Sequence, residues 1–125
     1  MMTDMSETGN QDAGLLAHAR ARPDHIALRQ GDEVRTYGEL DDRARRVAHA
    51  LAALGVRRGD RVAVMVPNSF EFFEAVHGAG RLGAVVVPVN IHFKADEAGW
   101  IVTDSGATAV VVAADLQTAL DGVSE

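Results

Sequence analysis

Cysteine is absent from this chain of 125 residues, and long apolar runs are absent as well. Without thiols there is no disulfide framework, no thiolate zinc site and no cysteine nucleophile, and a reducing, cytoplasmic compartment is expected. No apolar stretch approaches the roughly 20 residues that a membrane-spanning helix needs, so no membrane span is predicted. Positive charge is in deficit, since 12 Lys and Arg against 18 Asp and Glu give a net charge of −6. That balance disfavours a nucleic-acid partner.

The length suits one folded region with a short leader before it. The first residues are small and polar, include Asp4, Glu7 and Asp12, and lack the basic start and apolar middle of a secretion signal. We therefore predict a disordered acidic leader over residues 1–13 and a single, truncated domain over residues 14–125.

The first half of that domain predicts a helix, a β-hairpin and a second, longer helix. Residues 15–22 form a short helix that Pro23 closes, and residues 26–29 and 33–36 flank a turn at 30–32.

Capping residues mark both ends of the longer helix. Thr36 and Glu39 have the spacing of a capping box, and Gly55 follows the last apolar residue as a left-handed cap. Between them, apolar residues recur at helical spacing and predict one buried face. That face comprises Leu40, Ala44, Val47, Ala48, Leu51 and Leu54.

The second half predicts a β-α-β-α-β unit. Residues 61–66, 85–89 and 109–113 are rich in valine, which is typical of strands buried on both faces of a parallel sheet. Parallel strands need crossover helices, and residues 68–81 and 96–103 have helical patterns. The fold class is therefore α/β.

Individual residues within this unit have predicted positions too. Asn68, with Glu71 three residues later, is expected to cap the first crossover helix. Trp100, the single tryptophan, is assigned to core packing in preference to ligand stacking. Residues 105 and 106 end the second crossover helix, and residues 116–123 are expected to begin another.

A glycine-rich motif, GAGRLG at residues 78–83, matches the dinucleotide fingerprint G-x-G-x-x-G letter for letter. The fingerprint requires a strand before it and a helix after it, so that a helix N-terminus meets the pyrophosphate. Here a predicted helix precedes it and a predicted strand follows. We interpret Gly78, Gly80 and Gly83 as packing and capping residues, with no nucleotide bound.

Other residues that often carry chemistry have ordinary explanations. Lys94 is the only lysine, so no Walker-type phosphate loop exists, and the five histidines lack the paired spacing of a zinc helix. Ser69 lacks the flanking glycines of a nucleophile elbow and is better explained as a helix cap. Glu71 and Glu74 are expected on a solvated helix face. The chain thus predicts no catalytic, cofactor-binding or metal-ligating residue.

Three stretches in register resemble the start of the adenylate-forming (AMP-binding) superfamily. They are TYGEL at 36–40, GDRVAVMVPNS at 59–69, and GAVVVPVN at 83–90 leading to DSGA at 104–107. Their order and spacing agree with that superfamily from about residue 15 to residue 114. The resemblance is nearest to acyl-CoA synthetases and implies the front part of their large N-terminal α/β domain.

The resemblance also implies a function for the parent protein. The parent is expected to be an ATP-dependent acid–thiol ligase of fatty acid metabolism, which would convert an acid to an acyl-adenylate and then to acyl-CoA with Mg-ATP and coenzyme A. The phosphate loop, ribose-binding acid and mobile-domain lysine of that family match no position here. The chain is therefore expected to be inactive alone, with the remainder of its own chain as its partner.

The sequence is also compatible with two alternatives. IHFK at 91–94 and Gly99-Trp100 depart from the commoner family pattern, so a peptide-synthetase adenylation domain is the second reading. A free-standing, non-catalytic binding module is the third. The sequence leaves open which carboxylic acid and which thiol react, the oligomeric state, and whether the gene continues past Glu125.

Overall fold

The computed structural model describes residues 14–120, so the predicted leader over 1–13 and residues 121–125 lie outside the described residues. The chain divides into two compact units, Met1–Arg43 and Ala44–Glu125, and each is considered by itself. Within residues 14–120, no helix combines the length and apolar character needed to cross a membrane.

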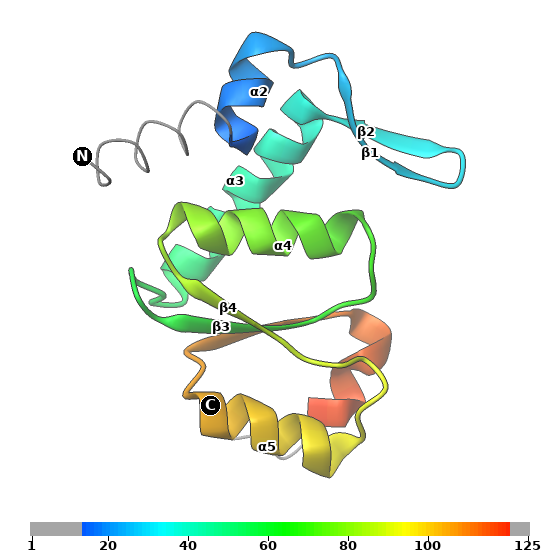
Figure 1. The fold of residues 1–125 in the computed structure, drawn as a ribbon. Helices are drawn as coiled ribbons and strands as arrows, with labels where there is room; N and C mark the ends of the chain where they lie inside the picture. The colour runs from blue at the N-terminus through cyan, green and yellow to red at the C-terminus, as the bar shows by residue number, and fades with distance from the viewer. Residues whose placement is uncertain (1–13, 121–125) are drawn as a thin grey trace, which may run out of the picture. The chain divides into compact units, whose positions relative to one another are not determined.

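The first unit contains a short helix and a hairpin, as predicted (Figure 1). Its elements are α2 (Leu15–Ala21), β1 (Ile26–Gln30), β2 (Glu33–Thr36) and the start of α3 (Tyr37–Ala53). β1 and β2 pair antiparallel, with Gln30 opposite Glu33. Gly31 has a φ of 61° at the first loop position, where a two-residue hairpin turn favours glycine.

The predicted capping box at the start of α3 is confirmed. The backbone N–H of Thr36 donates to Glu39 Oε1 at 2.9 Å, and the N–H of Glu39 donates to Thr36 Oγ1 at 3.1 Å. Gly55, with a φ of 92°, takes the predicted left-handed conformation. The prediction for Leu54 is wrong, because its side chain is 68% exposed. α3 ends at Ala53, so Leu54 belongs to the turn beyond the helix and leaves the apolar face.

The second unit is the predicted β-α-β-α-β unit, and its fold class is α/β. It begins with the end of α3, from Ala44 onward. Its further elements are β3 (Arg61–Met65), α4 (Phe70–Arg81), β4 (Val85–Pro88), α5 (Ala95–Ser105), β5 (Ala109–Val112) and the 3₁₀ helix η1 (Ala114–Leu120). All three strands are parallel, and their order is β4-β3-β5. η1 begins close to the predicted last helix, whose final residues lie outside the described range.

The sheet is covered by α4 on one face and by α5 on the other (Figure 1). Side chains of β3 alternate between the two cores, as the two-residue period of a strand requires. Val62 and Val64 pack in the cluster with Ala75 and Ala79 of α4, whereas Met65 belongs to the cluster of α5. β3 is thus buried on both faces, as predicted.

β4 was expected to be buried on both faces, and that prediction is wrong. Val85 is 52% exposed and Pro88 is exposed, because β4 is an edge strand of the described sheet. Proline has no N–H to donate to a neighbouring strand, so an edge position suits Pro88. A valine-rich run alone does not distinguish a central strand from an edge strand.

The prediction that Trp100 packs in the core is also wrong. Its side chain is 66% exposed. α5 buries Ala98 and Val102, which lie two positions before and after Trp100. At about 100° per residue, these neighbours stand on the side of the helix opposite to Trp100.

Candidate functional site

The chain segments that follow β3 and β4 diverge at the carboxyl ends of these two strands. The two strands are adjacent and parallel. The chain leaving β3 enters α4 on one face of the sheet, and the chain leaving β4 enters α5 on the other (Figure 1). In open α/β sheets, ligands bind in the crevice outside the carboxyl ends of strands whose connections part in this way. A ligand site is therefore expected at this topological switch point.

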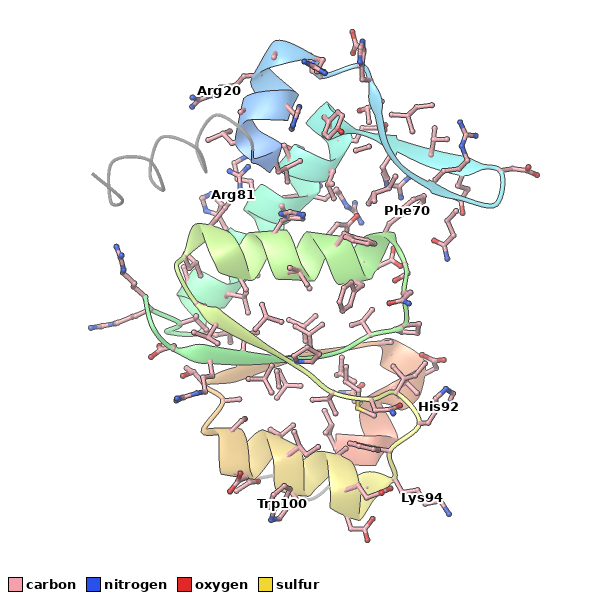
Figure 2. The ribbon with its side chains drawn as sticks, in the orientation of Figure 1. Arg20, Phe70, Arg81, His92, Lys94 and Trp100 are labelled. Atoms are coloured by element: carbon pink, nitrogen blue, oxygen red, sulfur yellow. The ribbon has the colours of Figure 1, made fainter. Side chains whose placement is uncertain are left out.

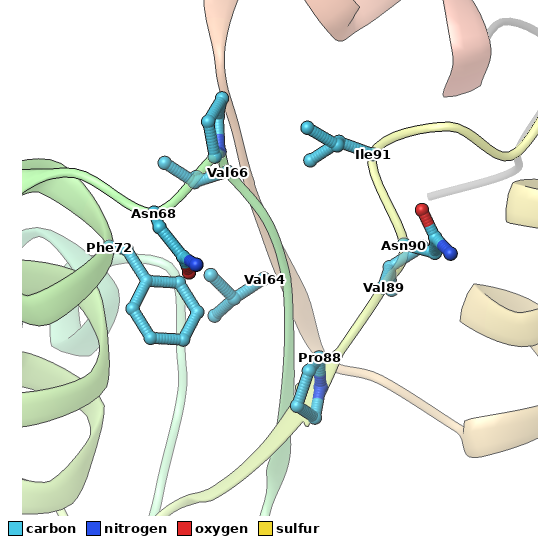
Figure 3. Close-up of a pocket in the computed structure, with 9 residues that line it drawn as sticks. Val64, Val66, Asn68, Phe72, Pro88, Val89, Asn90 and Ile91 are labelled. Carbon is cyan, nitrogen blue, oxygen red and sulfur yellow. The ribbon is translucent and has the colours of Figure 1, made fainter.

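A cleft of about 450 Å³ lies at this switch point. Figure 3 shows residues from the β3 end and the β4 end facing each other across it. Most of the lining is apolar, and two side-chain amides provide its polar groups. The lining residues are Val64, Val66, Pro67, Asn68, Phe72, Pro88, Val89, Asn90 and Ile91.

The β3 side of the cleft is fixed by the start of α4. Ser69, in an extended conformation, is the N-cap: its hydroxyl accepts from the Phe72 N–H at 3.4 Å and donates to the Pro67 carbonyl at 2.8 Å. The prediction that Ser69 caps a helix is confirmed, and the prediction that Asn68 is the cap is wrong. Because Ser69 takes that role, the exposed amide of Asn68 remains at the rim of the cleft.

The β4 side is fixed by backbone and side-chain hydrogen bonds. The Val89 N–H donates to the Val64 carbonyl at 2.9 Å, which extends the pairing of β3 with β4 to the cleft. Asn90 Oδ1 accepts from the His92 N–H at 2.8 Å, and the Asn90 carbonyl accepts from the Phe93 N–H at 3.1 Å. These bonds form a local turn, so Asn90 helps to shape the loop that leads into α5.

The cleft carries no charged side chain among its lining residues. A phosphate or carboxylate would find no cation there, whereas a neutral group with hydrogen-bonding atoms would find Asn68 and Asn90. In residues 14–120, no group of His, Cys, Asp and Glu could hold a metal ion. The lining residues of the cleft therefore do not fit Mg-ATP. The cleft is suited to a neutral part of a ligand or of a polypeptide.

The glycine motif has the element order of a packing feature. α4 ends at Arg81 and β4 begins at Val85, so a helix precedes the motif and a strand follows. Gly83 has a φ of 73° in the connecting turn. A Cβ atom on Gly78 would lie 2.6 Å from Val47 Cγ1, so only glycine allows this approach of α4 to α3. Gly80 has open space around it, and the packing role predicted for it is not found.

The two glutamates of α4 lie in different surroundings. Glu71 is exposed as predicted, but Glu74 is only 4% exposed, so the prediction of a solvated face is wrong for it. Glu74 shares the buried side of the helix with Ala75 and Gly78. His77, also on α4, is half-buried, and desolvation lowers its pKa from the ordinary value of 6.5.

Sequence reasoning missed the cleft residues. The available signal was the recurrence of proline and asparagine at the ends of two consecutive strands, at Pro67-Asn68 and at Pro88-Val89-Asn90. Such residues end strands, and in a parallel sheet the carboxyl ends of neighbouring strands share one edge. Strand order was also needed, because only adjacent strands bring the two segments together.

Comparisons with known proteins agree on one family. The profile of the AMP-binding enzyme family matches residues 15–125. The chain is similar to long-chain-fatty-acid–CoA ligase FadD13 of Mycobacterium tuberculosis, with 42% identity over 88 residues, 70% of this chain and 18% of that protein. It is also similar to a plipastatin synthase of Bacillus subtilis, with 38% identity over 98 residues, 78% of this chain and 4% of that protein.

A solved structure shows the same similarity in three dimensions. The Mycobacterium tuberculosis fatty acyl CoA synthetase superposes with a TM-score of 0.79 and 38% identity, covering 86% of this chain and 22% of that one. The chain thus spans about a fifth of the length of the curated ligase and of the solved synthetase that it matches.

Proposed function

The chain belongs to the AMP-binding enzyme family, and on that basis we propose that it is the N-terminal segment of an AMP-forming acyl-CoA synthetase. The parent enzyme would join a carboxylic acid, most simply a fatty acid, to coenzyme A with the use of ATP. Its partners would be those three substrates and the remainder of its own chain, in the cytoplasm. The family match over residues 15–125 carries this proposal.

Within that enzyme, the role of this segment is structural. Its cleft has an apolar lining with two amides and no charge, so charged substrate groups would be held by residues outside this cleft. We infer that the 125-residue chain alone catalyses no ATP–pyrophosphate exchange with any carboxylic acid. Exchange clearly above background that is lost on heating the purified chain would overturn this inference.

A chimeric enzyme tests the proposed role directly. Residues 15–120 of this chain would replace the matching segment of FadD13, and formation of acyl-CoA would be measured with a long-chain fatty acid. We expect a folded chimera with activity close to that of its parent, because 86% of this chain superposes on a fatty acyl CoA synthetase with a TM-score of 0.79. A folded but inactive chimera would contradict the proposal.

A peptide-synthetase adenylation domain is the second candidate, because the plipastatin synthase matches at 38% identity. The same segment would therefore be placed in an adenylation domain of that protein, with amino-acid-dependent pyrophosphate exchange as the measurement. We expect this second chimera to lose more of its parent's activity than the first. The reverse order would favour the peptide-synthetase reading, and failure of both would favour a free-standing binding module.

A further inference from the structure

Trp100 is the large aromatic side chain that α5 leaves in solvent. It is 66% exposed, and Figure 2 shows it on the side of α5 away from the sheet. Exposed tryptophan is unusual, since burying such a ring contributes more to stability or binding than burying almost any other side chain. Tryptophan is also enriched among the residues that contribute most to protein–protein binding.

The neighbours of Trp100 on α5 are acidic. Asp96 and Asp104 lie four positions before and after it, which places them one helical turn away on the same side. Glu97 and Thr103 flank this line at three positions' distance. All five side chains are exposed, and none of the five is basic. We call these five residues, Asp96, Glu97, Trp100, Thr103 and Asp104, the Trp100 face.

The carboxylates of this face retain unused acceptor capacity. One oxygen of Glu97 accepts from the Lys94 N–H at 3.1 Å, and one oxygen of Asp96 accepts from the Glu97 N–H at 3.0 Å. The side chain of Asp104, within α5, makes no hydrogen bond or ion pair with any residue in the described part of the chain. A carboxylate has about four acceptor positions, so each of the three can accept further donors.

We propose that the Trp100 face is a docking surface for an arginine-bearing segment of a partner protein. A guanidinium is attracted to the π-face of tryptophan and stacks flat on it, and its planar fork also matches a carboxylate bidentately. Because the Trp100 ring lies between Asp96 and Asp104 on one side of α5, a single arginine could stack on the ring and pair with a carboxylate at the same time. Lysine carries a compact and strongly hydrated point charge, so it is expected to bind the ring and the carboxylates less tightly than arginine.

The Trp100 face is separate from the cleft at the switch point. The cleft is lined by residues that end β3 and β4, whereas the Trp100 face lies on the outer side of α5. The inference therefore does not depend on the proposed ligase function, and a failed chimera leaves it unaffected.

The single tryptophan of the chain makes a direct test possible, because all indole fluorescence reports from this face. An arginine–glycine peptide would be titrated into the 125-residue chain, with lysine–glycine and glutamate–glycine peptides of equal length for comparison. We expect saturable change of the emission with the arginine peptide, weaker binding of the lysine peptide, and none of the glutamate peptide. Equal affinity for arginine and lysine peptides, or binding without any change in emission, would overturn the proposal.

Charge-matched variants separate this face from general attraction to an acidic chain. The double variant Asp96→Asn/Asp104→Asn removes two charges from the face, and Asp32→Asn/Glu33→Gln removes two exposed charges from the hairpin. We expect the first to weaken peptide binding about two- to fivefold for each aspartate, and the second to leave it unchanged. Equal weakening in both would mean non-specific attraction, and the proposal would fail.

Two further measurements complete the test. With a dye-labelled arginine peptide and anisotropy detection, Trp100→Leu should lose binding while circular dichroism stays unchanged, and Trp100→Phe should retain part of it. If Trp100→Leu binds like the parent chain, the ring has no role and the proposal is wrong. A shift in tryptophan emission with protein concentration alone would instead identify the face as a contact between copies, which also contradicts it.

Discussion

At the scale of single residues, two glycines of α4 differ in the space available for a side chain. A Cβ on Gly78 would meet the Val47 side chain at 2.6 Å and the Ala44 carbonyl oxygen at 2.9 Å, whereas a Cβ on Gly80 would meet nothing within 4 Å. Both glycines lie in α4, so helix propensity alone treats them equally. Packing distinguishes them.

We expect Gly78→Ala to lower the free energy of unfolding by about 1–3 kcal/mol, because the new methyl group overpacks the contact between α4 and α3. Gly80→Ala is the matched control and should raise it by about 0.4–1 kcal/mol, because alanine restricts the unfolded chain. Urea unfolding of both variants measures the difference. A stabilised Gly78→Ala variant would show that the contact is not made.

The half-buried His77 predicts a pH effect at the same scale. Burial lowers its pKa in the folded state below 6.5, so the unfolded chain binds this proton more readily than the folded chain. The free energy of unfolding is therefore expected to decrease as the pH falls below about 6.5 towards the folded-state pKa of His77. His77→Gln should be less sensitive to pH in that range. Unfolding curves collected from pH 8 to pH 5 test this, and identical pH dependence in both proteins would contradict it.

At the scale of elements, the ends of helices are encoded locally. Thr36 and Glu39 exchange hydrogen bonds of 3.1 Å and 2.9 Å with each other's backbone N–H groups, as their spacing predicts. Ser69 and Gly55 likewise act within their own segments. Such contacts span only a few residues, so the sequence specifies them without knowledge of the remaining fold.

Removal of the capping hydroxyl provides the test for α3. Thr36→Ala should lower the free energy of unfolding by about 1 kcal/mol, because the Glu39 N–H loses its acceptor. Thr36→Ser keeps the hydroxyl and should keep most of that stability. Thermal unfolding of the two variants, compared with the parent chain, measures the contribution of the box. Equal losses in both would assign the effect to the threonine methyl group instead.

At the scale of the whole molecule, we expect the edge strands of the described sheet to govern the behaviour of the chain in solution. β4 is an edge strand of the described sheet, and Val85 on it is 52% exposed. The valines of the other edge strand, β5, were predicted to be buried on both faces and are half-buried, against clusters on both sides of the sheet. Exposed apolar edge strands favour pairing with another chain.

We expect the purified chain to self-associate as its concentration rises, and Val85→Lys to reduce that association by placing a charge at the edge. Leu54→Lys is the control, because Leu54 is 68% exposed but lies in the turn after α3. Sedimentation velocity over a range of concentrations measures the outcome. A monomer at all concentrations, or equal effects of the two lysines, would show that the β4 edge is not the site of association.

The sequence by itself determined the order of the elements, the caps at Thr36, Gly55 and Ser69, the parallel sheet and the family resemblance. Each of these depends on patterns within a segment: two-residue and 3.6-residue periods, capping spacings and runs of valine. The element order around residues 78–83, with a helix before the glycine motif and a strand after it, was also predicted from the sequence.

Only the tertiary structure decided which strand lies at an edge, which side chains remain exposed and where the cleft forms. The valine-rich sequence of β4 resembles that of β3. Strand order nevertheless places Val85 on an edge strand and Val62 on the central strand of the described sheet. Trp100 is exposed because α5 turns Ala98 and Val102 towards the sheet. The cleft exists because two segments that are distant in the sequence end side by side, and such proximity is a property of the packed sheet and not of either segment.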